Sequence, residues 1–136
     1  MNDSFNIFPV GIIKKQGEKT WIEIFKKYAD ALLGLDEFSH ITVCYWLHQN
    51  DNPDQRSILQ VHPRKDKKNP LTGVFATHSP LRPNLIAISI CQILSIKENT
   101  IYLDKIDAFD ESPVVDIKCF IPSSIAKSDV KLPDWV

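Results

Sequence analysis

The feature that most limits the possible folds of this chain is the alternation of residue types over positions 85–96. Side chains two apart on an extended strand point to the same side, so the large apolar residues share one face: Ile86, Ile88, Ile90, Leu94 and Ile96. Turn-forming residues follow at 97–99, and residues 100–106 are predicted to return as the second strand of a hairpin. Further strands are predicted over residues 8–13, 20–25, 39–48, 57–61 and 114–121.

One short helix is predicted over residues 26–33, with Gly34 at the position of a helix C-terminal glycine. Residues 49–56 and 62–70 are predicted to be loops. Several short, regularly spaced strands are typical of an all-β barrel. We therefore expect a mostly β, single-domain antiparallel β-barrel-like fold with one or two short helices. The domain is expected to span residues 1–136, with its core at about 7–122 and a C-terminal tail at 123–136.

The last predicted strand has its own alternation, in which Val115, Ile117, Cys119 and Ile121 share a face. The chain contains no strand followed by a GxGxxG turn, and this argues against a doubly wound dinucleotide-binding fold.

The charge balance and the cysteines limit the class of protein. The chain has 136 residues with 16 basic and 17 acidic side chains, and this argues against a broad basic surface for nucleic acid. Cys44, Cys91 and Cys119 are odd in number and scattered, which favours a reducing compartment and no metal site. No apolar run reaches the roughly 18 residues of a membrane span, and no signal peptide is evident. We expect a cytoplasmic protein without membrane contact.

Polar residues gather in the segment GVFATHSPLRPN at positions 73–84. Pro80 and Pro83 stiffen it, since proline fixes φ, and Thr77, His78, Ser79 and Arg82 supply donors. A rigid, donor-rich loop binds a polar ligand at little entropic cost. The alternative is a proline-ordered turn that carries a surface arginine.

Three other places carry candidate functional groups. His48 and Gln49 lie where a buried strand is predicted to meet solvent, although His48 alone is equally consistent with a packed histidine. Residues 106–118 hold four carboxylates, which either contact a ligand or form a solvated turn: Asp107, Asp110, Glu111 and Asp116. The loop 62–70 either contacts an RNA backbone or is a solvated charged face. Its basic side chains are Arg64, Lys65, Lys67 and Lys68.

Three blocks of the chain together resemble a known family. GLDEFSHI (34–41), GVFATHSPLRPNLIAIS (73–89) and DAFDESPVVDIKCF (107–120) are similar, in sequence and in order, to blocks of the TrmO family, also called TsaA-like or YaeB-like. The resemblance covers about residues 7–122. His78 stands where the family has an arginine, and Glu111 stands where it has a glycine.

The resemblance implies a homodimeric β-barrel methyltransferase that uses S-adenosylmethionine. Its expected substrate is tRNA, methylated on the exocyclic nitrogen of a threonylcarbamoylated adenosine beside the anticodon. By position, the implied cofactor contacts are His48, Gln49, His78, Ile88, Ile106, Asp107, Ala108 and Phe109. Candidates for holding the substrate are Arg82, Asn84 and Asp116. His78 and Asp110 are the candidates for assisting the reaction, because deprotonation would activate a weakly nucleophilic nitrogen.

Two alternatives to this activity stay open. One is a non-catalytic barrel that binds S-adenosylmethionine or RNA, and the other is a methyltransferase with a different acceptor. The non-catalytic barrel is favoured by His78, which stands where the family has an arginine, and fold similarity by itself does not establish a function.

Overall fold

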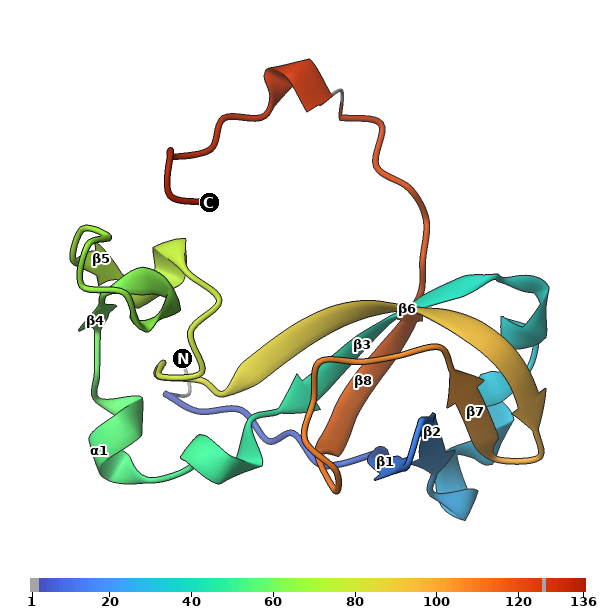
Figure 1. Cartoon of the computed structure of the whole chain (residues 1–136). Helices are drawn as coiled ribbons and strands as arrows, with labels where there is room; N and C mark the ends of the chain where they lie inside the picture. Colours follow the sequence, from blue (N-terminus) through green and yellow to red (C-terminus); the bar gives the residue numbers. More distant parts are fainter. Residues whose placement is uncertain (1–2, 126) are drawn as a thin grey trace.

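Six antiparallel strands close into a barrel in the computed structural model, which describes residues 3–125 and 127–136 (Figure 1). Around the barrel the order is β1-β2-β7-β6-β3-β8. This confirms the predicted mostly β, antiparallel barrel with short helices. The six strands are β1 (Gly11–Gln16), β2 (Lys19–Ile24), β3 (His40–Trp46), β6 (Ile86–Lys97), β7 (Thr100–Leu103) and β8 (Pro113–Cys119).

The hydrophobic core fills the inside of this barrel. Alternate residues of β3 point inward, and Ile41 and Val43 have no exposed surface. They meet Ile13, Ile22 and Ile101 from the opposite strands, which are equally buried. The predicted alternation over residues 39–48 is therefore that of a strand with one buried face.

In most of β6, by contrast with β3, the large apolar residues lie on the outer side of the barrel. Ser89 and Cys91 face the barrel interior, whereas Ile86, Ile88 and Ile90 face outward. Further along, the pairing with β7 shifts between Ile93 and Ser95, and both Ile93 and Ile96 pack against the core. Ile88 is 65% exposed and Ile90 57% exposed. Cys91 and Ser89 pair with the fully buried Ile41 and Val43 of β3. The strand was predicted correctly, but of its predicted apolar face only Ile96 packs against the core.

A bulge corrects the predicted face of β8. The pairing with β3 shifts between Cys44 and Tyr45, so that Cys44 lies opposite Asp116 and Tyr45 lies opposite Val114. Val115 is the extra residue, and a bulge of this kind reverses the alternation on one side of itself. Val114, rather than Val115, is therefore fully buried.

Several predicted boundaries also differ from the structure. The first strand begins at Gly11, because Pro9 lacks the N–H that a ladder requires. The loop 49–56 contains α1 (Pro53–Arg56), which Asn52 caps by accepting a hydrogen bond from Gln55 N at 2.9 Å. The strand at 57–61 shrinks to β4 (Gln60–Val61), and the helix at 26–33 is the 3-10 helix η1 (Lys26–Leu32).

The remaining parts of the chain lie outside the barrel. Residues 48–84, which we call the lobe, hold α1, β4 and β5 (Thr72–Gly73), together with the short 3-10 helices η3 (His48–Asn50), η4 (Pro63–Lys65) and η5 (Val74–Ala76). After β8 the chain leaves the barrel, arches away from it and ends above the lobe (Figure 1). We call residues 127–136 the tail.

Candidate functional site

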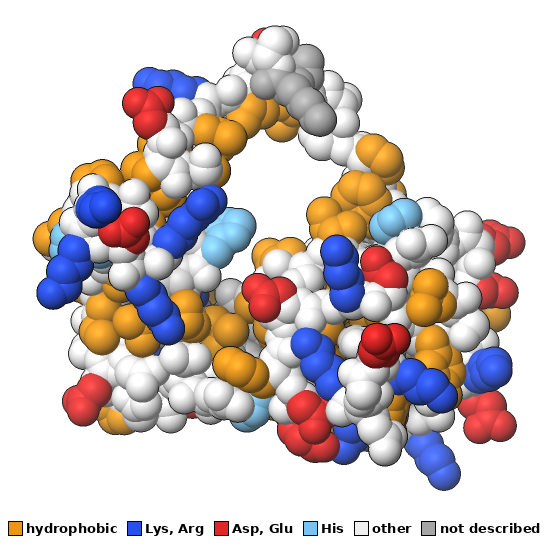
Figure 2. All heavy atoms as spheres, in the orientation of Figure 1, with side chains coloured by type: hydrophobic (Ala, Val, Ile, Leu, Met, Phe, Trp, Pro, Cys, Tyr) orange, Lys and Arg blue, Asp and Glu red, His pale blue; other side chains and the backbone are white. Residues whose placement is uncertain are grey.

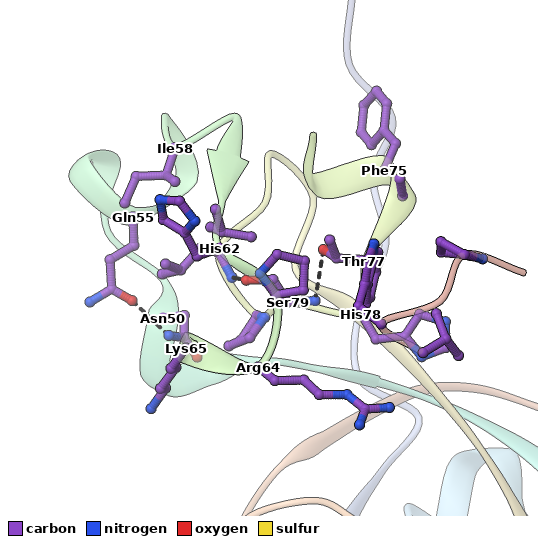
Figure 3. A pocket seen from close by; sticks show the side chains of 18 of the residues that line it. Asn50, Gln55, Ile58, His62, Arg64, Lys65, Phe75, Thr77, His78 and Ser79 are labelled. Carbon is purple, nitrogen blue, oxygen red and sulfur yellow. Dashed lines mark hydrogen bonds between the residues drawn. The ribbon is translucent and has the colours of Figure 1, made fainter. Parts of the chain in front are cut away.

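A cavity of about 1110 Å³ separates the lobe from the tail. Its lobe walls come from η4, from residues before it and from the segment 73–84, and Leu132 and Trp135 of the tail complete it. Figure 3 shows Arg64 extending to the side of the cavity on which His78 lies, with Lys65 and Gln55 at the other side. The cavity therefore joins two segments that the sequence marked separately, the basic loop and the segment 73–84.

The segment 73–84 is held rigid by its own polar side chains. Thr77 Oγ1 donates to Val74 O at 2.9 Å and accepts from Ser79 N at 3.1 Å. Ser79 Oγ in turn accepts from Leu81 N at 3.1 Å. Both hydroxyls thus stabilise turns of the main chain, which leaves the exposed His78 as the titratable side chain that this segment presents to the cavity.

Arg82 also forms hydrogen bonds within this segment. Its Nη1 donates to Thr77 O at 3.1 Å and to Ser79 O at 3.0 Å. A guanidinium has five N–H donors, so this arrangement orders the loop and leaves further donors for a ligand. Asn84, the other predicted substrate residue of the segment, is exposed directly before β6.

The basic loop has an unusual backbone. Arg64 and Lys65 are consecutive and both have positive φ, at 60° and 57°. Such a conformation is unfavourable for residues with a side chain and persists only where the surroundings hold it. Here His62 Nδ1 pairs with Asn69 O at 2.9 Å, and Asn69 Nδ2 donates to Pro63 O at 2.9 Å. These bonds fix the loop while both basic side chains stay exposed.

His48 and Gln49 follow β3 in η3, at the point where the barrel leads into the lobe. His48 is partly buried and Gln49 is exposed. Next to them, Arg56 lies over the Trp46 ring at 5.5 Å and donates to Pro83 O at 2.9 Å. Arg56 therefore connects the end of β3 to the end of the segment 73–84.

The loop after β7 is attached to the barrel through its main chain. Lys15 Nζ donates to Ile106 O at 2.7 Å, and the Tyr45 hydroxyl donates to Asp107 O. Burial raises the pKa of Tyr45, so its hydroxyl stays protonated and able to donate. Ile106 is buried, whereas the side chains of Asp107 and Phe109 are exposed and Ala108 packs against the core.

The two other predicted carboxylates have structural contacts. Asp110 Oδ1 accepts from the Lys15 backbone N–H at 2.7 Å. Asp116 Oδ1 accepts from Ile117 N at 2.9 Å on the outside of β8. The register places Asp116 and Ile88 on either side of Cys44, so these two residues share one level of the outer face. Desolvation, with the Asp116 charge second, raises the pKa of the Cys44 thiol.

The predicted site residues therefore fall into three groups within one chain. His48, Gln49 and residues 106–109 lie near the β3 end of the barrel, Ile88 and Asp116 lie on its outer face, and His78 and Arg82 lie in the lobe. Among the described residues that line the cavity, His78 is the one that belongs to the predicted cofactor set.

Comparison with known proteins assigns the family. The family model described as the tRNA-methyltransferase O N-terminal domain matches residues 6–125, a range that includes β1 to β8 and the segment 73–84. The chain belongs to the TrmO family. This confirms the resemblance drawn from the three sequence blocks.

Relatives of this TrmO-family chain differ in length. A probable S-adenosyl-L-methionine-binding protein of Methanocaldococcus jannaschii is 46% identical over 112 residues, covering 82% of this chain and 89% of the relative. The tRNA (adenine(37)-N6)-methyltransferase of Mus musculus is 36% identical over 98 residues, covering 72% of this chain. The chain spans only 22% of that mouse protein.

A solved structure has the same fold. The crystal structure of TrmO from P. aeruginosa matches with a TM-score of 0.73 at 24% sequence identity, and the match covers 99% of this chain. The chain spans 63% of that protein, less than two thirds. At this identity the match supports the fold and no finer statement.

Two residues of this TrmO-family site were missed by sequence reasoning. Arg56 was assigned to a loop, and Trp135 belonged to a tail with no periodic pattern. A tryptophan next to the last residue of the tail was the one signal available, because so large an apolar side chain seldom stays in water without a partner. Within residues 3–125 and 127–136, no three metal-ligating side chains cluster, and no helix there has the length and apolar character to span a membrane.

Proposed function

We propose that this chain is an S-adenosylmethionine-dependent methyltransferase that methylates the exocyclic adenine nitrogen of a tRNA nucleoside beside the anticodon. The observation that carries the proposal is the family match over residues 6–125, which contains the segment 73–84 and the loop 106–109 in one unit. The name of the mouse relative supports tRNA as the substrate, and the name of the archaeal relative supports the cofactor.

The loop 106–109 has the chemistry that the cofactor requires. S-adenosylmethionine combines a positive sulfur and an ammonium group with an adenine ring, so it calls for a carboxylate next to an apolar surface. Asp107 and Phe109 offer both on side chains directed to solvent, while Tyr45 and Lys15 fix their main chain. Preorganised main chain lowers the entropic cost of binding. We assign the cofactor to this loop together with His48, Gln49, His78 and Ile88.

The reaction requires positioning more than covalent chemistry. When bound, S-adenosylmethionine supplies a methyl group on a positively charged sulfur, which leaves as a neutral thioether. The acceptor nitrogen must approach in line and give up its proton, and alignment of this kind contributes much of the rate. His78 is exposed on a rigid segment and has a ring nitrogen to receive that proton. Asp110 is held by Lys15 N and is the second candidate.

Arg82, Asn84 and Asp116 are proposed to hold the substrate. Arg82 donates hydrogen bonds to Thr77 O and Ser79 O, and its remaining N–H donors suit the carboxylate of a threonylcarbamoyl group. Its position is set by the loop, so this contact would be preorganised.

We further propose a homodimer in which a second copy covers the outer face of β6. Four large apolar side chains are exposed there in one row, and apolar patches of this kind mark interfaces: Ile86, Ile88, Ile90 and Leu94. The division of the site residues into three groups supports the same assembly, because a partner would bring lobe and barrel residues of two chains together.

We place this protein in the cytoplasm, consistent with three free cysteines, and treat residues 1–136 as one domain.

A non-catalytic S-adenosylmethionine- or RNA-binding barrel is the second candidate. The observation that favours it is His78, which replaces a permanently charged arginine of the family with a weakly basic ring. A methyltransferase with another acceptor would share the same cofactor site.

The test is methyl transfer to threonylcarbamoylated tRNA. The purified chain is incubated with S-adenosylmethionine carrying an isotopically labelled methyl group, and the nucleosides are analysed by mass spectrometry. We expect label on the modified adenosine and loss of that label in Asp107→Asn. Labelled cofactor bound without product would favour the non-catalytic barrel, and label on another nucleoside would identify another acceptor.

The dimer is tested by light scattering. We expect twice the chain mass for the unaltered protein and a single-chain mass for Ile90→Asp, because a buried carboxylate without a partner is costly. Leu59→Asp, at an exposed position of the lobe before β4, is the matched control and should remain dimeric. A dimeric Ile90→Asp would place the interface elsewhere.

A further inference from the structure

We propose that the cavity between the lobe and the tail binds a single-stranded RNA nucleotide, with its base stacked on Trp135 and its phosphates held by Arg64 and Lys65. This inference rests on the proposed function, since it names the place where the RNA substrate is held. It adds a role for the tail, which contributes four of the cavity's lining residues: Leu132, Pro133, Trp135 and Val136.

The charge of the cavity suits an anion. Its described lining includes Arg64, Lys65, His62 and His78 and no aspartate or glutamate. Figure 2 shows basic and histidine side chains at the lobe side of the hollow beneath the arch of the chain, whereas acidic side chains lie at its barrel side. A positive sulfur is favoured by a carboxylate, which the loop 106–109 offers in Asp107 and the cavity lining lacks, although His78 of the lining is shared with the proposed cofactor set. The cavity is therefore complementary to phosphate, while the cofactor loop is complementary to a cation.

The shape and the aromatic content suit a nucleobase. Trp135 is half-buried at the cavity wall, and Phe75 of the lobe is 85% exposed beside the same cavity. Proteins that read unpaired nucleotides stack the bases on aromatic side chains and hold the backbone with Arg and Lys. A cavity of about 1110 Å³ is at the upper end of ligand pockets. It has room for a base, its ribose and the adjoining phosphates.

The conformation of the basic loop supports a binding role. Arg64 and Lys65 hold positive φ angles that cost free energy, and hydrogen bonds from His62 and Asn69 maintain them. Within the described residues, neither Arg64 nor Lys65 forms an ion pair with a carboxylate. The backbone of both residues is thus held in place, and both cations remain available for an external anion. Strained backbone of this kind is concentrated at binding sites.

The test compares binding of an anticodon stem-loop RNA by fluorescence anisotropy with binding of S-adenosylmethionine by calorimetry. Trp135→Ala should weaken RNA binding about 10-fold, the typical loss for one stacked base. Trp135→Phe should recover most of that loss because it restores an aromatic face. Val130→Ala, an exposed tail position outside the cavity lining, is the matched control and should bind RNA normally. All variants should bind the cofactor as the unaltered chain does.

A second measurement tests the phosphate contacts. Each phosphate contact to a single strand adds about 0.7 to the slope of log affinity against log salt. Arg64→Gln and Lys65→Gln should each reduce that slope by about this amount, whereas Lys19→Gln, on β2 at the barrel, should not change it.

The outcomes separate this inference from the proposed function. Unchanged RNA affinity in Trp135→Ala, with cofactor binding intact, would overturn the inference and leave the methyltransferase proposal standing. So would a change in oligomeric state without a change in RNA affinity, since Trp135 would then contact a second copy. Absence of cofactor binding in the unaltered chain would instead contradict the proposed function.

Discussion

The barrel and the lobe are stabilised in different ways. The barrel buries a continuous apolar core, in which Ile13, Ile22, Ile41 and Ile101 have no exposed surface. In the lobe, by contrast, Pro63 and Val74 are the buried residues among those described. The two strands of the lobe, β4 and β5, have two residues each, and its shape depends on side chains that bond the main chain.

Because of this difference, the residues that stabilise the fold are distinct from those that carry ligand contacts. Burial of apolar surface is the dominant favourable contribution to folding, and the barrel provides it without exposing reactive groups. Loops on a rigid scaffold can then carry ligand contacts at low stability. In this chain the cationic cavity lies entirely in the lobe and tail, whereas the cofactor loop 106–109 is fastened to the barrel by Lys15 and Tyr45.

The largest expected effect comes from the barrel core. Ile41→Ala should lower the free energy of unfolding by about 2–5 kcal/mol, because it removes buried methyl groups and leaves a cavity. Urea unfolding measures this change. Leu33→Ala, at a position that is 95% exposed, should change it by less than about 0.5 kcal/mol. Equal effects in the two variants would contradict the description of the barrel as the stabilising unit.

A substitution in the lobe should have a local effect instead. Arg82→Met leaves Thr77 O and Ser79 O without their donor, and a charged hydrogen-bonding partner contributes about 1.5–3 kcal/mol. Hydrogen exchange at the amides of Ser79 and Leu81 should accelerate roughly 10-fold or more. The urea midpoint should stay nearly constant. A large shift of that midpoint would mean that the lobe and the barrel unfold as one unit.

The stability of the barrel should depend on pH through the buried thiol of Cys91. Burial raises the pKa of Cys91 from 9.0 to about 11. Above pH 9 the unfolded chain releases this proton and the folded chain retains it, so ionisation favours unfolding. Between pH 9 and pH 11 stability should therefore fall by about 1.4 kcal/mol per pH unit from this group. Cys91→Val should lose that part of the slope, and an identical slope in both proteins would show that Cys91 is not buried as described.

The smallest effect is expected at the turn before β8. Glu111 has φ of 70°, and its Oε1 accepts from Lys14 Nζ at 2.6 Å in an exposed ion pair of little net value. Glu111→Gly should therefore be about 1 kcal/mol more stable than Glu111→Ala, since only glycine adopts this φ without strain. Thermal unfolding of the two variants provides the comparison. An alanine variant as stable as the glycine variant would contradict the strain.

Sequence patterns predicted the barrel better than the lobe for a physical reason. Alternation with a period of two residues identified β3 and β6, because the two faces of a strand can be read from its own sequence. It did not say which face of β6 is inside, since that depends on how β6 pairs with β3 and β7. The bulge at Val115 depends on pairing between β3 and β8, which no single segment encodes.

The candidate site was predictable only in part. The segment 73–84 was recognised from its prolines and donors, and the structure shows that Thr77, Ser79 and Arg82 hold that segment together. The role of Trp135 could not be read from its neighbours, because the cavity forms between segments that are more than fifty residues apart in sequence.

The central claim is that the loop 106–109 binds S-adenosylmethionine through Asp107. Calorimetric titration of the full chain with S-adenosylmethionine, and with its demethylated product, tests it most directly. We expect saturable binding of both ligands and a clearly greater loss in Asp107→Asn for the positively charged cofactor than for the neutral product. Absence of binding at millimolar ligand, or equal losses for the two ligands, would contradict it.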